Sequence, residues 1–175
     1  MDISQCSSCQ HEMNGLVRYC PMCNGEMKLV VEDGERTCPR CVQPLEIHHY
    51  HHHDIDTCPL CEGMWIEPET FRVLTTEFDV FRDPSADPNY KRPGYNQAEG
   101  YLPCACCSKL MVRKNYKRVS GVMIDLCLNC GVWLDKDELK QIRNFIASGG
   151  LNRAQDHELE KQRQKLNQID EQSAR

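Results

Sequence analysis

The hydrophobic residues of the chain occur in short runs, none longer than four residues, between polar and turn-forming segments. Runs of this length suit the strands of hairpins or one face of a helix, and they are too short to cross a lipid bilayer. Residues 28–31, Lys-Leu-Val-Val, fit a strand, and residues 32–35, Glu-Asp-Gly-Glu, fit the turn after it. The pattern therefore predicts several small hairpins instead of one large core.

Helical periodicity begins after each of the two tryptophans. Pro68 suits the first turn of a helix, and Asp135 with Glu138 three residues later has the pattern of a capping box. Apolar residues then recur at helical spacing, which predicts two amphipathic helices. The predicted buried faces are Phe71, Leu74 and Phe78 in the first helix and Leu139, Ile142 and Ile146 in the second.

Two polar segments lack this organisation. Residues 82–100 contain three prolines and two glycines without an apolar period, which predicts an extended linker. Residues 151–175 are polar and follow two glycines, and we expect a helix there. A heptad repeat covers only two turns of it, so we interpret this tail as a helix that is frayed or that depends on a partner. The heptad positions are Leu159, Gln162, Leu166 and Ile169.

Cysteine content changes this picture, because 13 cysteines occur in 175 residues. Such a content indicates either disulfides in an oxidising compartment or bound metal in a reducing one. Bound metal is favoured by the odd number of cysteines, by their spacing and by the lack of signal-peptide features in residues 1–5. The same lack of signal-peptide features predicts a cytoplasmic protein. Small units that bury little apolar surface need such a staple, and zinc contributes about 10–16 kcal/mol to folding in model peptides.

The cysteines form six Cys-x-x-Cys pairs, and each pair can aim two thiolates at one ion. Taken in sequential order, the pairs predict three structural zinc sites. In a shifted frame the second and third pairs share an ion; an internal repeat favours the sequential frame. The predicted ligands are Cys6, Cys9, Cys20 and Cys23; Cys38, Cys41, Cys58 and Cys61; and Cys104, Cys107, Cys127 and Cys130. Cys106 is left over, either as a spare thiol beside the third site or with a redox or second-metal role.

The second and third units repeat one pattern. Each has an Ile-Asp dipeptide before its second cysteine pair and a Gly-x-Trp-x-acid segment after it, at residues 55–56 and 63–67 and again at residues 124–125 and 131–135. Both units resemble the transcription factor IIB-type zinc ribbon that occurs in many small prokaryotic proteins. The first unit, at residues 6–25, is similar to the shorter double-knuckle ribbons.

The resemblance implies a small metal-stabilised fold of mostly short antiparallel β-hairpins, the zinc ribbons, with two or three α-helices, no single large core and three Zn²⁺ per chain. The third unit has one residue fewer before its tryptophan and a longer hairpin, which we expect to spare the metal ligands. The expected divisions are an N-terminal ribbon at 1–37, a second ribbon with its helix at 38–80, a linker at 81–103, a third ribbon with its helix at 104–148, and a polar helical tail at 149–175.

Two clusters are candidate binding surfaces. Cations and a tyrosine on the third hairpin, on alternating faces of a strand, could contact phosphates or an acidic protein surface, or they could be ordinary solvated residues. These are Lys109, Arg113, Lys114, Tyr116, Lys117 and Arg118. In the His-rich hairpin 48–53, a strand would place His49, His51 and His53 on one face, where they could hold an extra metal ion; the other interpretation is a polar exposed hairpin.

The closed thiolate sites argue against catalysis, and the sequence has no Ser-His-Asp set, phosphate loop or dinucleotide fingerprint, so we predict a protein that is not an enzyme. Zinc ribbons generally bind proteins or nucleic acids. The formal charge of −5 favours a non-enzymatic adaptor or regulatory protein with a protein partner. The alternatives are a nucleic-acid-associated or transcription-related factor that uses residues 109–118, and metal storage or delivery through residues 48–53.

Overall fold

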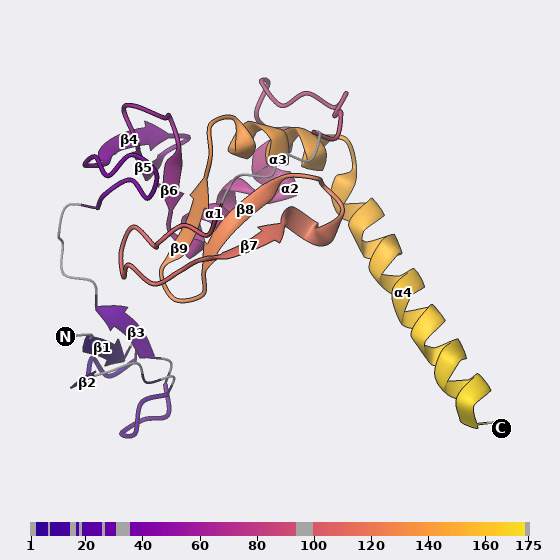
Figure 1. Ribbon diagram of the computed structural model, residues 1–175, viewed down its shortest axis with the longest axis horizontal. Coiled ribbons are helices and arrows are strands. Elements are labelled where there is room, and N and C mark those ends of the chain that lie inside the picture. The colour runs from indigo at the N-terminus through magenta and orange to yellow at the C-terminus, as the bar shows by residue number, and fades with distance from the viewer. Residues whose placement is uncertain are drawn as a thin grey trace. The chain divides into compact units, whose positions relative to one another are not determined.

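The computed structural model describes residues 3–6, 8–14, 17, 19–25, 27–30, 36–93 and 100–173 (Figure 1). Two compact units are each assembled from separate segments. The first comprises Met1–Pro68, Gly100–Val112 and Asp125–Lys136, and the second comprises Glu69–Glu99, Arg113–Ile124 and Asp137–Arg175. This division is of a different kind from the ribbon-by-ribbon boundaries expected from the sequence, which stay a prediction.

The N-terminal ribbon has a three-stranded antiparallel sheet of its own, in the order β2-β1-β3. Its strands are β1 (Ile3–Cys6), β2 (Glu12–Asn14) and β3 (Met27–Val30). In the central strand, Ser4 lies opposite Met13 on one side and Leu29 on the other. The buried cluster beside this sheet is small and consists of Cys6, Cys20 and Met27.

A second sheet contains six strands in the order β4-β5-β6-β9-β8-β7. The strands are β4 (Glu46–Tyr50), β5 (His53–Thr57), β6 (Met64–Ile66), β7 (Val112–Asn115), β8 (Met123–Cys127) and β9 (Gly131–Leu134). Pairing of β6 with β9 joins the second ribbon to the third, and its register places Trp65 opposite Trp133. The two hairpins therefore share one continuous hydrogen-bonded sheet.

The helix predicted after Pro68 is interrupted. Helix α1 (Pro68–Leu74) ends before Thr76, which caps the short helix α2 (Glu77–Phe81) by accepting a hydrogen bond from the Asp79 amide at 3.2 Å. Because the new cap rotates the second segment, Val80 is buried and Phe78 is 73% exposed. The predicted stripe is thus right for Leu74, which is fully buried, and wrong for Phe78.

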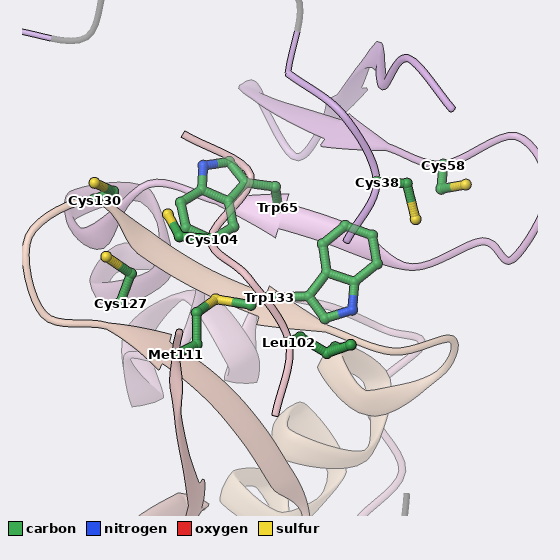
Figure 2. Close-up of a cluster of buried hydrophobic side chains, with 9 residues drawn as sticks. All are labelled: Cys38, Cys58, Trp65, Leu102, Cys104, Met111, Cys127, Cys130 and Trp133. Atoms are coloured by element: carbon green, nitrogen blue, oxygen red, sulfur yellow. The ribbon is translucent and has the colours of Figure 1, made fainter. Parts of the chain in front are cut away.

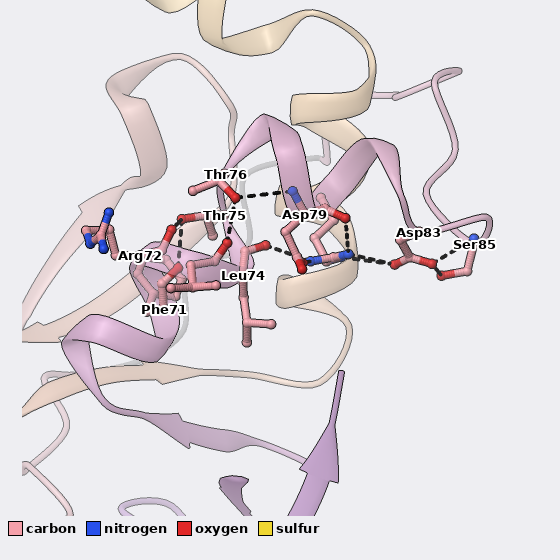
Figure 3. A network of polar contacts seen from close by, with 10 residues as sticks. Phe71, Arg72, Leu74, Thr75, Thr76, Asp79, Asp83 and Ser85 are labelled. Atoms are coloured by element: carbon pink, nitrogen blue, oxygen red, sulfur yellow. Dashed lines mark hydrogen bonds and ion pairs between the residues drawn. The ribbon is translucent and has the colours of Figure 1, made fainter. Parts of the chain in front are cut away.

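The second unit is held together by a buried arginine. Arg143 is 1% exposed and donates hydrogen bonds to the Leu74 carbonyl at 2.7 Å and to the carboxylates of Asp79 and Asp83 at 2.6 and 2.9 Å. These acceptors are labelled in Figure 3. Burial alone would raise the pKa of Asp83, but hydrogen bonds from Ser85 and the Arg143 charge outweigh it and lower that pKa. The charges are therefore paired and satisfied, as burial requires.

Helix α3 (Glu138–Ala147) buries Leu139, Ile142 and Ile146 as predicted. The predicted capping box is wrong, because the residue before the helix is Asp137, in a left-handed conformation and without a side-chain cap hydrogen bond. Helix α4 (Gly150–Ser173) follows Gly149, whose φ of +76° is the left-handed conformation that suits a helix end. No helix in the described part of the chain is both long enough and apolar enough to cross a membrane.

Part of the predicted linker is packed. The Asp87 amide donates to the Asn144 side chain at 2.8 Å, and the Tyr90 hydroxyl donates to the Ser120 carbonyl at 2.7 Å. The Tyr90 ring also meets Phe145 edge-on. Residues 94–99 of the linker lie outside the described residues. Side-chain contacts to α3 therefore order a stretch that the sequence pattern predicted to be an extended linker.

As a whole, the fold confirms the expectation of short antiparallel hairpins with helices and no single large core. The described residues form four α-helices instead of two or three, because Thr76 divides the helix after Pro68 and because the tail contributes α4. Buried apolar residues are distributed over separate clusters, and cysteines belong to two of them. The cysteines are therefore part of the packing as well as candidates for binding metal.

Candidate metal centres

Five of the six Cys-x-x-Cys knuckles have the same backbone geometry. At the knuckle of Cys58, for example, the Cys58 amide donates to the Gly63 carbonyl at 2.8 Å and the Cys58 carbonyl accepts from the Glu62 amide at 3.0 Å. The residue after the second cysteine turns the chain with a positive φ of about 55–60°. These residues are Gln10, Asn24, Val42, Glu62 and Ser108.

The twelve cysteines of the knuckles gather into three groups of four sulfur atoms, and the sulfurs within each group lie within 4.8 Å of one another. Measured pairs include Cys9–Cys20 at 3.6 Å, Cys38–Cys61 at 3.6 Å and Cys107–Cys127 at 3.7 Å. A zinc tetrahedron with Zn–S bonds of about 2.3 Å has sulfurs about 3.8 Å apart. The groups join consecutive knuckles, as in the sequential frame, and form three zinc sites.

Backbone amides within the knuckles point at the sulfurs. The Ser8 amide donates to the Cys6 sulfur at 3.4 Å, and the Cys41 amide donates to the Cys38 sulfur at 3.3 Å. Hydrogen bonds to a thiolate favour the charged form. The amides of Cys9 and Ser8 accordingly lower the pKa of Cys6 to about 6. At Cys6 the amides therefore favour the thiolate that binds zinc, whereas at Cys38 burial and the neighbouring sulfurs of Cys58 and Cys61 outweigh the amides and raise the pKa.

The sixth knuckle, Cys127 to Cys130, departs from the others. Gly131 follows it directly with a φ of +155° and already pairs with Cys127 as the first residue of β9. A Cβ atom at Gly131 would lie 2.5 Å from the Ile66 carbonyl oxygen, so only glycine fits this close approach. Direct entry into β9 explains why the third unit has one residue fewer between its last cysteine and its tryptophan than the second unit has. The four sulfurs of the third site still converge.

Each tryptophan covers the knuckle of the opposite ribbon. A Cβ atom added to Gly63, next to the second zinc site, would overlap the Trp133 ring, and one added to Gly131 would lie 3.0 Å from Cζ2 of Trp65. Figure 2 shows Trp65 toward Cys104 and Cys130 and Trp133 toward Cys38. Both tryptophans belong to one buried cluster with cysteine ligands of both sites. No pattern in the sequence indicated that the two tryptophans cross over in this way.

Two arginines tie this region together. Arg40, inside the knuckle of Cys38 and Cys41, donates to Asp135 at 2.6 Å, and Asp135 also accepts from Nε1 of Trp133 at 3.2 Å. Arg36 bonds to Asp56 and, at 2.9 Å, to Glu67. Sequence reasoning missed these pairs because they join residues up to 95 positions apart. The one signal was that Asp135 and Glu67 occupy equivalent places in the repeat.

The indole nitrogens differ. Trp133 Nε1 has the Asp135 acceptor, whereas Trp65 Nε1 is buried without a hydrogen-bond partner among the described residues.

The leftover Cys106 lies near the sulfurs of the third site. Hydrogen bonds with the sulfurs of Cys104 and Cys130 and the nearby Arg36 charge lower the pKa of Cys106 to about 4. Cys106 thus lies beside the third site, and the choice between a spare thiol and a redox or second-metal role stays open.

The basic candidate surface is not one strand. Strand β7 ends at Asn115, and residues 116–118 form a 3₁₀ turn, η1, in which Lys117 has a φ of +50°. Tyr116 is 6% exposed and lies edge-on to Phe71 and Phe145, so it cannot stack on a base. Arg118 forms an ion pair with Glu158 at 2.6 Å. The predicted alternation of these side chains between two faces of a strand is therefore wrong, because the strand ends before Tyr116 and the turn buries the Tyr116 ring.

The histidine hairpin does not place three imidazoles on one face. His51 and His52 form its two-residue turn with φ of +47° and +68°, and the strands pair His49 with Asp54 and Tyr50 with His53. Neighbouring strand residues point to opposite faces, so His49 and His53 are separated. Among the described residues, the groups suited to a metal ion contain only cysteines. The predicted placement of His49, His51 and His53 on one face is therefore wrong, because a two-residue turn with positive φ at both positions interrupts the strand.

Comparison with known proteins adds one finding. Residues 37–75 match a family model described as transcription factor zinc-finger. This range holds the whole second ribbon and α1, and it supports the resemblance for that unit. No curated protein and no solved structure matches the chain. That the third ribbon is a second copy of this family, and that the protein is prokaryotic, stay predictions.

Proposed function

We propose that this protein is a non-enzymatic adaptor or regulatory protein whose zinc ribbons are structural and whose partner is another protein. The observation that carries the proposal is the closure of every metal centre by four cysteine sulfurs. A catalytic zinc needs an open coordination position, and these sites have none to offer. The zinc-finger family matched by residues 37–75 agrees with a zinc-binding factor that is not catalytic.

Helix α4 supports a protein partner. Leu159, Leu166 and Ile169 are 52–62% exposed on an otherwise polar helix. They occupy three of the four heptad positions, with Gln162 at the fourth, and a short apolar stripe of this kind is typical of a helix that pairs with another protein segment. The apolar stripe, defined as these three residues, is the surface that we assign to the partner.

Nucleic acid is a weaker candidate. The formal charge is −5, and each zinc with four thiolates adds a further charge of about −2, so the body of the protein repels phosphate. The burial of Tyr116 removes the aromatic side chain that could have stacked on a base. Of the basic cluster, Arg118 is already paired with Glu158. These features favour an interaction through the apolar stripe over one through residues 109–118.

The test is a crosslinking pulldown with three forms of the full-length protein. The stripe variant carries Leu159→Ser, Leu166→Ser and Ile169→Ser. The control variant carries Lys161→Ser, Gln164→Ser and Asn167→Ser on the opposite side of the same helix, with a similar cost in helix propensity. We expect wild type and control to retain the same protein and the stripe variant to lose it. Equal capture by all three forms contradicts the assignment of the stripe.

Two further measurements separate the alternatives. Binding of single-stranded and duplex oligonucleotides at low salt, weakened by Lys114→Ala and Arg118→Ala, would establish the nucleic-acid factor instead. A concentration-dependent molar mass that the stripe variant abolishes would identify a second copy of this chain as the occupant. The adaptor proposal predicts a constant mass and no salt-sensitive binding of nucleic acid.

A further inference from the structure

The second and third zinc sites are packed against one buried cluster of side chains. The same buried cluster contains Cys38 and Cys58 of the second site, Cys104, Cys127 and Cys130 of the third, and both tryptophans. The two indole rings are 1% and 0% exposed, so the cluster between the sites is almost entirely excluded from water. A change at one site therefore reaches residues that pack against the other.

Each tryptophan contacts the zinc site of the other ribbon. Strand β9 carries Trp133, which lies against Gly63 at the second site, and strand β6 carries Trp65, which lies against Gly131 at the third. Strand β9 starts directly after the last ligand of the third site, Cys130. The start of β9 therefore lies next to the third site, while the ring that this strand carries lies against the second site. Strand β6 carries the ring that lies against the third site and begins three residues after Cys61, a ligand of the second site.

We propose that the second and third zinc ions are bound as a coupled pair, with Trp133 as the positioning residue of the second site and Trp65 as that of the third. Zinc in one site raises the affinity of the other, and linkage requires the effect to be the same in both directions. The first zinc site is the internal reference, because its ribbon has a sheet and a buried cluster of its own.

The coupling is tested by deleting one site in the full-length protein and following zinc release from the others into excess chelator. With Cys38→Ser and Cys41→Ser, we expect the third site to release zinc roughly tenfold faster, which corresponds to about 1.4 kcal/mol in the activation free energy of release. With Cys104→Ser and Cys107→Ser, the second site should be accelerated by a similar factor. The first site should keep its rate in both variants. Unchanged rates at the remaining member of the pair overturn the proposal.

The role of the tryptophans is tested without removing any ligand. Trp133→Leu should accelerate release from the second site more than from the third, and Trp65→Leu should do the reverse. Cadmium-113 NMR of the metal-exchanged protein reads each site separately, with signals assigned from the cysteine variants. The conservative Trp133→Phe should restore most of the retention. If each substitution affects mainly the site of its own ribbon, or both sites equally, the crossed assignment is wrong.

Discussion

The first ribbon and the joined second and third ribbons use the same four-thiolate chemistry but protect it differently. In the first, Cys9 and Cys23 are exposed, and Met27 is the large apolar residue that the described part of this ribbon buries with the ligands. In the joined ribbons, two tryptophans cover the ligands and Cys130 is 9% exposed. The comparison shows that the cysteine pattern specifies where zinc binds, whereas the surrounding packing decides how tightly the site is closed.

Zinc removal has the largest expected effect, because zinc contributes on the order of 10–16 kcal/mol to the folding of a small ribbon. In excess chelator we expect the zinc of the first ribbon to leave roughly tenfold faster than the other two zinc ions. This ratio corresponds to about 1.4 kcal/mol in the activation free energy of release. A zinc-sensitive dye that reports one fast and two slow equivalents would confirm this. Cys23→Ser should abolish the fast phase, and a fast phase that survives it contradicts the comparison.

The second compact unit offers a contrast without metal, because all three cysteine groups belong to the first compact unit. Arg143→Met leaves the buried Asp83 carboxylate without its cation, and we expect a loss of about 3–5 kcal/mol in the free energy of unfolding. Zinc content should stay at three. The control is Arg72→Met, which removes an exposed ion pair with Glu69 and should cost less than about 1 kcal/mol. Denaturant unfolding measures both, and equal losses would refute a special role for Arg143.

Matched glycine substitutions sharpen the contrast between ribbons. A Cβ at Gly63 would overlap the buried Trp133 ring, which cannot move without opening the core, so Gly63→Ala should cost about 1–3 kcal/mol. A Cβ at Gly25 would meet Oγ of Ser8 at 2.7 Å, which can rotate away, and the sulfur of Cys6 and Cβ of Ser8 at 3.1 Å, which need shift by only a few tenths of an ångström. We therefore expect Gly25→Ala to cost clearly less. Thermal unfolding of the zinc-loaded variants is the measurement, and the reverse order would contradict the packing described.

The local part of this architecture could be predicted from the sequence. A Cys-x-x-Cys knuckle closes within a few residues, so spacing identified the six knuckles, and the internal repeat favoured the pairing of consecutive knuckles that forms the three groups of sulfurs. The buried face of α3 was also predictable, because Leu139, Ile142 and Ile146 follow the helical period and all are buried.

The remainder depends on contacts between distant segments. Asp135 has the spacing of a helix cap, yet it is used by Arg40, and Tyr116 stands among cations, yet it is buried against Phe145. Neither outcome has a signal in the neighbouring residues. The crossing of Trp65 and Trp133 depends in the same way on the pairing of β6 with β9, which no periodicity encodes.

The smallest expected effect concerns the charged tie between the joined ribbons. Arg40 and Asp135 are 27% and 34% exposed, so water screens the pair and compensates for its loss. We expect Arg40→Ala to cost only about 0.5–1 kcal/mol in unfolding experiments, and Lys136→Ala, which removes the more exposed pair with Glu62, to cost less than about 0.5 kcal/mol. Because Asp135 still accepts from Trp133, zinc release from the second site should hardly change. A large acceleration would show that Arg40, and not apolar packing, keeps that tryptophan in place.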